Sequence, residues 1–134
     1  MIGDDVPVAF KAFGLYQFPY GISASASVQH FTGFPEVTTV LVSANTVSLT
    51  RVSQSLAVEP RATTRLPDVN FVDISVRRAF NLHGRYSVEP VLDIFNLTNG
   101  AAIRARTTQL GSTYGRVSDI QRARLIKLGV NIKF

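Results

Sequence analysis

Two carboxylates in one strand-like segment are the first candidates for chemistry. Glu89 and Asp93 are four residues apart, and a pair of carboxylates could act as general acid and base. On a β-strand the two share a face, but at about 3.3 Å per residue they lie roughly 13 Å apart. A paired-carboxylate site needs a separation of about 5 to 9.5 Å. The spacing therefore favours two charges on a water-filled surface over a catalytic pair.

No other residue set has the spacing of a catalytic, cofactor or metal site. The two histidines, His30 and His83, have no ligand-like side chains near them in sequence, so neither predicts a metal centre, and His83 suits a turn. Residues 111–115 lack the Lys-Ser/Thr pair of a phosphate-binding loop. The chain has no cysteine, which excludes disulfides and cysteine-based metal sites. The sequence predicts no enzyme and no cofactor.

Composition narrows the class of protein further. Hydrophobic residues make up 46% of the chain and charged residues 17%, which excludes a disordered protein. The 134 residues carry a formal net charge of +5, but the basic residues are scattered, so no nucleic acid is expected as a partner. Polar residues interrupt every hydrophobic stretch before the roughly 18 to 20 residues that a membrane helix needs, which excludes a helical membrane protein.

Hydrophobic residues recur at every second position, which is the period of a β-strand. We predict an all-β fold, an antiparallel meander with long strands near residues 7–18, 21–33, 69–80, 86–97 and 122–134. The last segment alternates most regularly. Its apolar positions are Ile126, Leu128, Val130, Ile132 and Phe134.

The connections between these strands alternate between short and long. Residues 19–21 and 81–85 form short turns, whereas 34–68 and 98–122 are long. Outer-membrane β-barrels have short periplasmic turns and longer extracellular loops. Residues 37–42 and 47–58 still alternate, so they could extend the strands. Since bacterial barrels have an even number of strands from about eight upward, we expect either a fragment of a larger barrel or a soluble protein.

Charged side chains fall on the face opposite the apolar one, where they would line the lumen of a barrel. These candidates are Asp73, Arg77, Glu89, Asp93, Lys127 and Lys133.

Two further features concern the apolar face and the strand backbone. Arg78 lies on the apolar face near a strand end, where it could extend its charge into lipid headgroups. Aromatic side chains near the short turns suggest a periplasmic girdle; they are Tyr16, Phe18, Tyr20 and Tyr86. Pro90 cannot donate to a ladder, so we predict a local bulge there.

Four segments resemble the last strands of TonB-dependent receptors, in particular the Oar-like subgroup with a carboxypeptidase-regulatory-like domain. They are LPDVNFVDISV at 66–76, VEPVLDIFNLTN at 88–99, LGSTYGR at 110–116 and RLIKLGVNIKF at 124–134. The resemblance covers most of the chain from about Phe10 onward.

The resemblance implies that residues 1–134 are the C-terminal part of a 22-stranded barrel in the bacterial outer membrane. It implies ligand uptake in the full-length receptor, which has a plug and an N-terminal part that contacts the TonB complex; both lie outside this chain. It also implies that Ile126, Leu128, Val130, Ile132 and Phe134 form the signal read by the barrel-assembly machinery. The other partners would be outer-membrane lipid and the remaining strands and plug of the parent chain. The alternative is a soluble antiparallel β-sandwich or small barrel that acts as a binding module.

Overall fold

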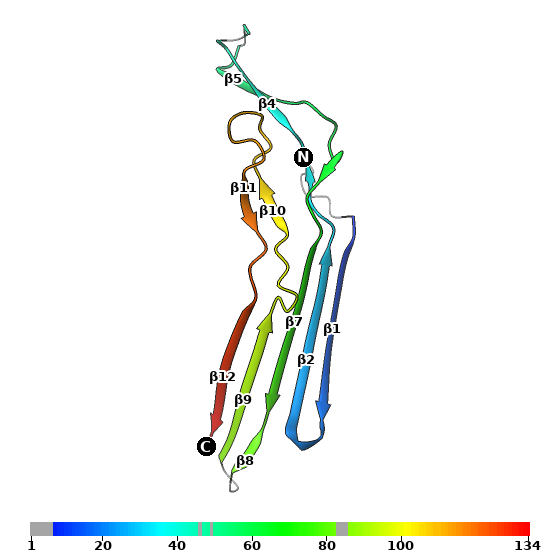
Figure 1. Cartoon of the computed structure of the whole chain (residues 1–134), viewed down its shortest axis with the longest axis vertical. Helices are drawn as coiled ribbons and strands as arrows, with labels where there is room; N and C mark the ends of the chain where they lie inside the picture. Colours follow the sequence, from blue (N-terminus) through cyan, green and yellow to red (C-terminus); the bar gives the residue numbers. More distant parts are fainter. Residues whose placement is uncertain (1–6, 46, 49, 83–85) are drawn as a thin grey trace. The chain divides into compact units, whose positions relative to one another are not determined.

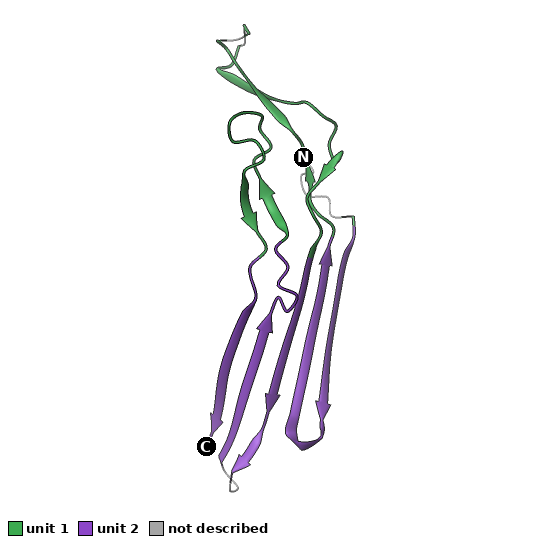
Figure 2. Cartoon of the chain, viewed as in Figure 1, with its two compact units in different colours: residues 1–7, 32–69, 102–121 green, residues 8–31, 70–101, 122–134 purple. Residues whose placement is uncertain are grey.

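The computed structural model describes residues 7–45, 47–48, 50–82 and 86–134, and the chain is all-β (Figure 1). It divides into two compact units (Figure 2). The sheet unit comprises Val8–Phe31, Asn70–Ala101 and Arg122–Phe134, and the loop unit comprises Met1–Pro7, Thr32–Val69 and Ala102–Gln121. In the described ranges, no helix has the length and apolar character needed to cross a membrane.

The sheet unit contains the five long strands that the alternation predicts. Their order is β1-β2-β7-β9-β12, so each pairs with its neighbour along the chain, and Figure 1 shows that successive strands run in opposite directions. The five-stranded antiparallel meander is therefore confirmed. The strands are β1 (Ala9–Phe18), β2 (Ile22–Phe31), β7 (Val69–Arg78), β9 (Tyr86–Phe95) and β12 (Leu125–Lys133).

The predicted turn at residues 19–21 is present as the single 3₁₀ turn η1 (Pro19–Gly21). Tyr20 and Gly21 adopt left-handed backbone conformations with φ of 65° and 72°. A Cβ on Gly21 would lie 2.9 Å from the carbonyl oxygen of Ala79, so this close approach also requires glycine. The second predicted turn, at residues 81–85, includes His83 and lies partly outside the described residues; Asn81 and Leu82 belong to strand β8 (Phe80–Leu82).

Pro90 interrupts a ladder without the bulge that the sequence predicts. Arg77 pairs with Val91, and Phe80 pairs with Val88. The two pairs are three positions apart on each strand, so no extra residue is inserted between them. The bulge prediction is therefore wrong. Arg78 is instead left opposite Pro90, which has no N–H to donate. The strand is therefore broken into β7 and β8 at this point.

The loop unit contains short antiparallel pairs where the sequence predicted mostly irregular chain. The alternating part of the first long connection forms the hairpin β4 (Thr39–Ser43) with β5 (Ser53–Ala57), which confirms that it is strand-like. Strands β3 (Pro35–Glu36) and β6 (Thr64–Arg65) pair at its base. The second long connection contains β10 (Ile103–Arg106) and β11 (Val117–Ile120), a pair that the alternation did not predict. Thr39 also makes an isolated parallel bridge with Gln109.

Gly33 allows a close backbone approach in the loop unit. The N–H of Leu66 donates to the carbonyl of Phe34 over 2.9 Å, and the N–H of Gly33 donates to Asp68 Oδ1 over 3.0 Å. A Cβ on Gly33 would lie 1.6 Å from the carbonyl oxygen of Leu66. The residue at position 33 must therefore be glycine for these bonds to form.

Gly33→Ala should open this contact, because forcing atoms into an occupied space costs about 1 to 3 kcal/mol. Amide hydrogen exchange at Leu66 measures the effect, and exchange there should become faster. Gly129→Ala is the control, since no atom lies within 4 Å of that added Cβ. Unchanged exchange at Leu66 in Gly33→Ala would contradict the close approach.

Candidate functional site

The strand pairing sorts the side chains of the sheet unit by residue number. Tyr16 pairs with Ala24, Ile74 with Ile94, and Leu128 with Leu92. Ile74 lines the same groove as Tyr16 and Ala24, so even-numbered residues of all five strands share one face. We call this the even face, and the opposite one the odd face.

The even face is apolar and exposed. Leu128 is 79% exposed and Val130 61%, although both are aliphatic. Among the described residues of the whole chain, only Leu66 and Val69 are buried hydrophobic side chains. A chain with 46% hydrophobic residues therefore buries almost none of them, and the strand alternation displays them instead. Four of the five proposed assembly-signal residues, Ile126, Leu128, Val130 and Ile132, lie on this face in β12, and Phe134 follows the strand.

The six predicted lumen-lining residues all lie on the odd face of β7, β9 and β12. Lys127 pairs with Asp93, and its Nζ lies 3.9 Å from Asp93 Oδ2. Asn131 pairs with Glu89 and donates to its Oε1 over 3.3 Å. The structure brings these pairs together across strands. Arg77 instead pairs with Val91, and Lys133 pairs with Ser87. Asp73 accepts a hydrogen bond from the backbone of Asn96.

The odd face is less polar at β1 than the alternation suggests. Phe13 is 74% exposed there, and Leu15 is 55% exposed. Serines of β2 lie opposite them: Phe13 pairs with Ser27, and Leu15 with Ser25. Both faces of β1 are therefore largely apolar, a departure visible in its sequence as a nearly continuous hydrophobic run.

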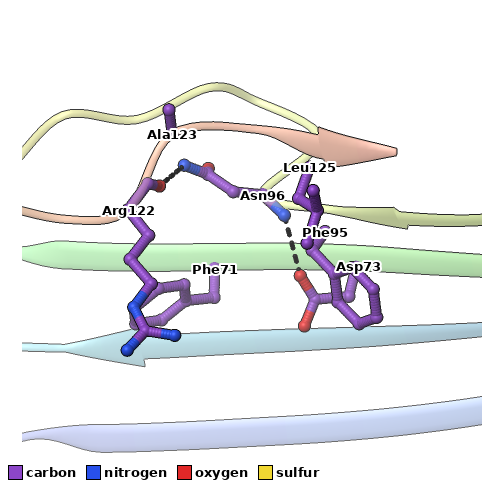
Figure 3. Close-up of a pocket in the computed structure, with 7 residues that line it drawn as sticks. All are labelled: Phe71, Asp73, Phe95, Asn96, Arg122, Ala123 and Leu125. Carbon is purple, nitrogen blue, oxygen red and sulfur yellow. Dashed lines mark hydrogen bonds between the residues drawn. The ribbon is translucent and has the colours of Figure 1, made fainter. Parts of the chain in front are cut away.

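Asn96 directly follows β9 and bonds both to β7 and to the segment that precedes β12, and the sequence analysis did not identify it. The residue is 3% exposed with φ of 51°, a conformation that asparagine tolerates. Its N–H donates to Asp73 Oδ1 over 2.9 Å, and its Nδ2 donates to the carbonyls of Gly100 and Arg122 over 2.9 and 2.6 Å (Figure 3). Its Oδ1 accepts from Gly100 N–H. The run NLTNG at 96–100 is the signal that predicts such a turn.

A shallow pocket of about 340 Å³ adjoins Asn96. Its lining combines apolar and charged side chains, which include Phe71, Asp73, Phe95, Arg122 and Leu125 (Figure 3). The Asp73 carboxylate is already engaged by Asn96, so the arrangement is that of a hydrogen-bonded strand end rather than a reactive centre.

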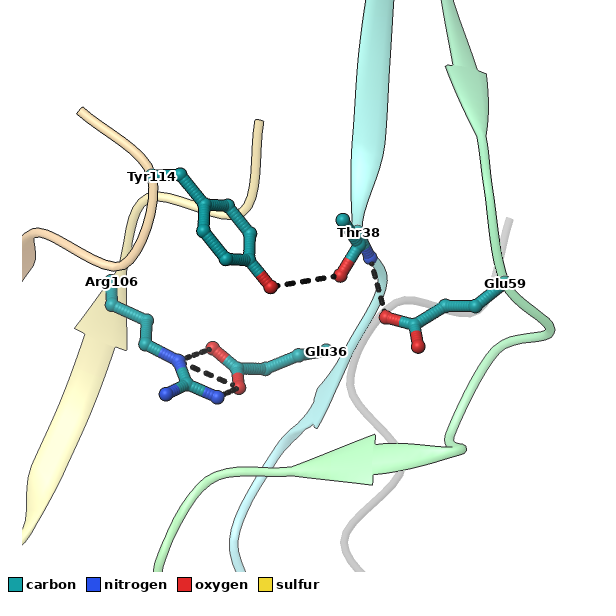
Figure 4. A network of polar contacts seen from close by, with 5 residues as sticks. All are labelled: Glu36, Thr38, Glu59, Arg106 and Tyr114. Carbon is teal, nitrogen blue, oxygen red and sulfur yellow. Dashed lines mark hydrogen bonds and ion pairs between the residues drawn. The ribbon is translucent and has the colours of Figure 1, made fainter. Parts of the chain in front are cut away.

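A polar network joins the two long connections within the loop unit (Figure 4). Arg106 donates from Nε to both carboxylate oxygens of Glu36 over 2.9 Å and from Nη2 to Oε2. Hydrogen bonding to Glu36, and secondly its charge, raises the pKa of Arg106. The Glu36 side chain is 7% exposed and that of Arg106 is 36% exposed. These residues are 70 positions apart in the chain, so the pair ties one connection to the other.

Thr38 extends the same network. Its hydroxyl lies 3.4 Å from the Tyr114 hydroxyl, and its N–H donates to Glu59 Oε1 over 2.9 Å. Hydrogen bonding from the Thr38 side chain, and secondly from its backbone, lowers the pKa of Glu59. Glu59 therefore stays ionised here to a lower pH than an isolated glutamate.

The histidines and aromatic residues occupy separate places. His30 shares a hydrogen bond of 2.8 Å with Asn70 Oδ1, and His83 lies outside the described residues. No group of three potential metal ligands occurs in the described part of the chain. The rings of Tyr16 and Phe18 meet edge to face at 4.6 Å, next to η1.

Comparison with known proteins gives no family: no family model matches the chain, and no similar protein was found among curated sequences or solved structures. The family resemblance, the lumen-lining role and the assembly signal therefore stay predictions.

The two partners of the buried ion pair should respond differently to substitution. Arg106→Met leaves the buried Glu36 carboxylate without its cation, so the loop unit should lose about 1 to 3 kcal/mol. Glu36→Gln should cost less, because the half-exposed Arg106 guanidinium can be hydrated.

Amide exchange at Thr39 and Leu110 measures this loss, since their hydrogen bonds join the two connections: Thr39 N–H donates to Thr108 and Leu110 N–H to Thr39. Arg104→Met is the control, because its 3.7 Å contact with Asp119 is exposed on both sides and is worth about 0 to 1 kcal/mol. An equal effect of Arg104→Met and Arg106→Met would refute the Glu36–Arg106 ion pair as the interaction that joins the two long connections.

Proposed function

We propose that this chain is the C-terminal part of an outer-membrane β-barrel, with the even face toward lipid and the odd face toward an aqueous lumen. The observation that carries the proposal is the exposed apolar face that stays in register across five strands. Transmembrane barrel strands alternate apolar outward and polar inward. A soluble protein rarely leaves so large an apolar surface uncovered.

Strand length supports the same proposal. Strands β1, β2, β7 and β9 contain 10 residues and β12 contains 9, whereas strands in globular proteins most often have about 5 or 6. A tilted transmembrane strand needs about 9 to 11 residues.

The two sheet edges support a larger parent barrel. Strands β1 and β12 lie at the ends of the strand order, and an unpaired edge in lipid leaves backbone groups unsatisfied at several kcal/mol each. Because β1 and β12 run in the same direction (Figure 1), antiparallel closure requires an odd number of further strands. At least three are needed to reach the smallest known barrels of about eight.

In this role the chain performs no catalysis. It supplies part of the wall of a TonB-dependent receptor, in which ligand uptake depends on a plug and on the TonB complex. The barrel-assembly machinery would insert it, guided by the apolar positions of β12 and by Phe134.

A soluble binding module is the second candidate, and one observation favours it. Phe13 and Leu15 are exposed on the odd face, where a second sheet of a sandwich could cover them. The barrel requires lipid to cover the even face, whereas the sandwich requires a second sheet to cover Phe13 and Leu15 on the odd face.

Solubility separates the two candidates. We expect the purified chain to require detergent micelles, because its even face is uncovered. Size-exclusion chromatography with light scattering checks this in buffer and in detergent. A monodisperse monomer in plain buffer would sink the barrel proposal and support the sandwich.

New charges should distinguish the faces. In the parent barrel, Ile74→Arg or Val130→Arg should cost about 2 to 4 kcal/mol if the residue lies near the bilayer midplane. Ser75→Arg and Asn131→Arg are the matched controls, because each neighbours the test residue on the odd face, and both should be mild. Denaturant-dependent folding into lipid vesicles gives the free energies. Equal costs on both faces would overturn the lipid-facing assignment.

A further inference from the structure

The even face has a single charged residue in the described strands. In β1, β2, β7, β8, β9 and β12, the even-numbered residues are apolar, aromatic, glycine or proline, except His30, Asn70 and Arg78. His30 and Asn70 hydrogen bond to each other, which leaves Arg78 as the one cation among hydrocarbon side chains. An arginine in that setting is costly unless it meets an anion or water.

The position of Arg78 in the sheet defines its depth. It ends β7, opposite Pro90, next to Ala79, whose N–H donates to the carbonyl of Gly21 in η1 over 2.9 Å. Arg78 therefore lies at the end of the sheet where the short connections turn. In a membrane barrel this end meets headgroups, and the cost of arginine falls there to about 0 to 1 kcal/mol.

The guanidinium of Arg78 lies over the ring of Phe80. Its Cζ is 4.6 Å from the centroid of that ring, a cation–π distance. This contact draws on the charge of the guanidinium, and a guanidinium can also bind one phosphate through two N–H donors.

An open apolar groove of about 460 Å³ begins at this arginine. The even-numbered residues of its lining are Ile22, Val76, Arg78, Pro90, Leu92, Leu128 and Val130, and the odd-numbered Arg77, Val91 and Gly129 also border it. The groove is therefore lined mainly by hydrocarbon groups from four strands, and Arg78 is its one cation on the even face. A ligand that fits it has an apolar chain and a single anionic group, which is the chemistry of a phospholipid.

We propose that Arg78 and this groove bind one membrane glycerophospholipid, with its phosphate on the Arg78 guanidinium and an acyl chain along Val76, Leu92 and Leu128. The inference rests on the proposed function, because it assigns a particular lipid contact to the even face. Arg77 also borders the groove, although the alternation places it on the odd face. Lys133 of β12 carries the same charge on the odd face, pairs with Ser87 and lies outside the groove lining.

The test compares Arg78→Gln with Lys133→Gln in the full chain, purified in a neutral detergent. The probe is phosphatidylglycerol added to the micelles, and native mass spectrometry counts the molecules retained. Arg78→Gln should weaken retention about tenfold, the effect of losing one charge-assisted hydrogen bond, while Lys133→Gln, which removes a cation of the odd face outside the groove, should match wild type. Arg78→Lys should be intermediate, because it keeps the charge but loses the paired donors.

Two further probes identify the part of the lipid that is bound. Diacylglycerol with the same acyl chains should be retained poorly by wild type, and inorganic phosphate should not compete. Equal loss in Arg78→Gln and Lys133→Gln, strong retention of diacylglycerol, or competition by inorganic phosphate would each overturn the lipid site.

Failure of the lipid site is distinguishable from failure of the proposed function. If the chain stays monodisperse without detergent, the membrane assignment itself is wrong. If it requires micelles but Arg78→Gln retains lipid like wild type, only the specific site is wrong.

Circular dichroism of each variant verifies that the β content is unchanged. Phe80→Leu offers a second test of the site, because it removes the ring beside the guanidinium and should also reduce retention.

Discussion

The antiparallel ladder holds the sheet unit together, because the described residues supply almost no buried core. Leu66 and Val69 are the buried hydrophobic side chains among these residues, and both belong to the loop unit. Backbone pairing fixes each strand, and an isolated sheet needs a covered hydrophobic face for independent stability. The even face therefore has to be covered from outside the described chain. A lipid bilayer meets this demand without a second layer of protein.

The strand pairing places the alternating apolar and polar residues on two opposite faces of the sheet. This part of the structure could be predicted from the sequence. The alternation around Ile74, Leu92 and Leu128 gave the strands and their faces, because a shift of one residue would reverse every side chain. The loop unit could not be predicted in the same way. The ion pair of Glu36 with Arg106 joins residues 70 positions apart, and no local pattern indicates such a contact. Asn96 is intermediate, since its NLTNG run predicts a turn but not the strands that it ties together.

Two features of the sheet unit depart from the simple alternation of apolar and polar residues. Phe13 and Leu15 place apolar rings and chains on the odd face of β1, next to the serines of β2. Asn96 satisfies the carbonyls of Gly100 and Arg122 at one end of the sheet. These bonds, with the one from Asn96 N–H to Asp73, join the ends of β7 and β9 to the segment that precedes β12.

In the proposed barrel, Pro90 and Arg78 would give two independent reasons for a membrane boundary at the same place. Pro90 has no N–H, so it cannot donate to the Arg78 carbonyl opposite it, and an unsatisfied carbonyl in hydrocarbon costs several kcal/mol. The Arg78 side chain carries the charge that hydrocarbon also disfavours. Both costs would disappear at headgroup depth, where water and phosphate are available. On this proposal, the break between β7 and β8 and the one charge on the even face occur at one place because the same boundary permits both.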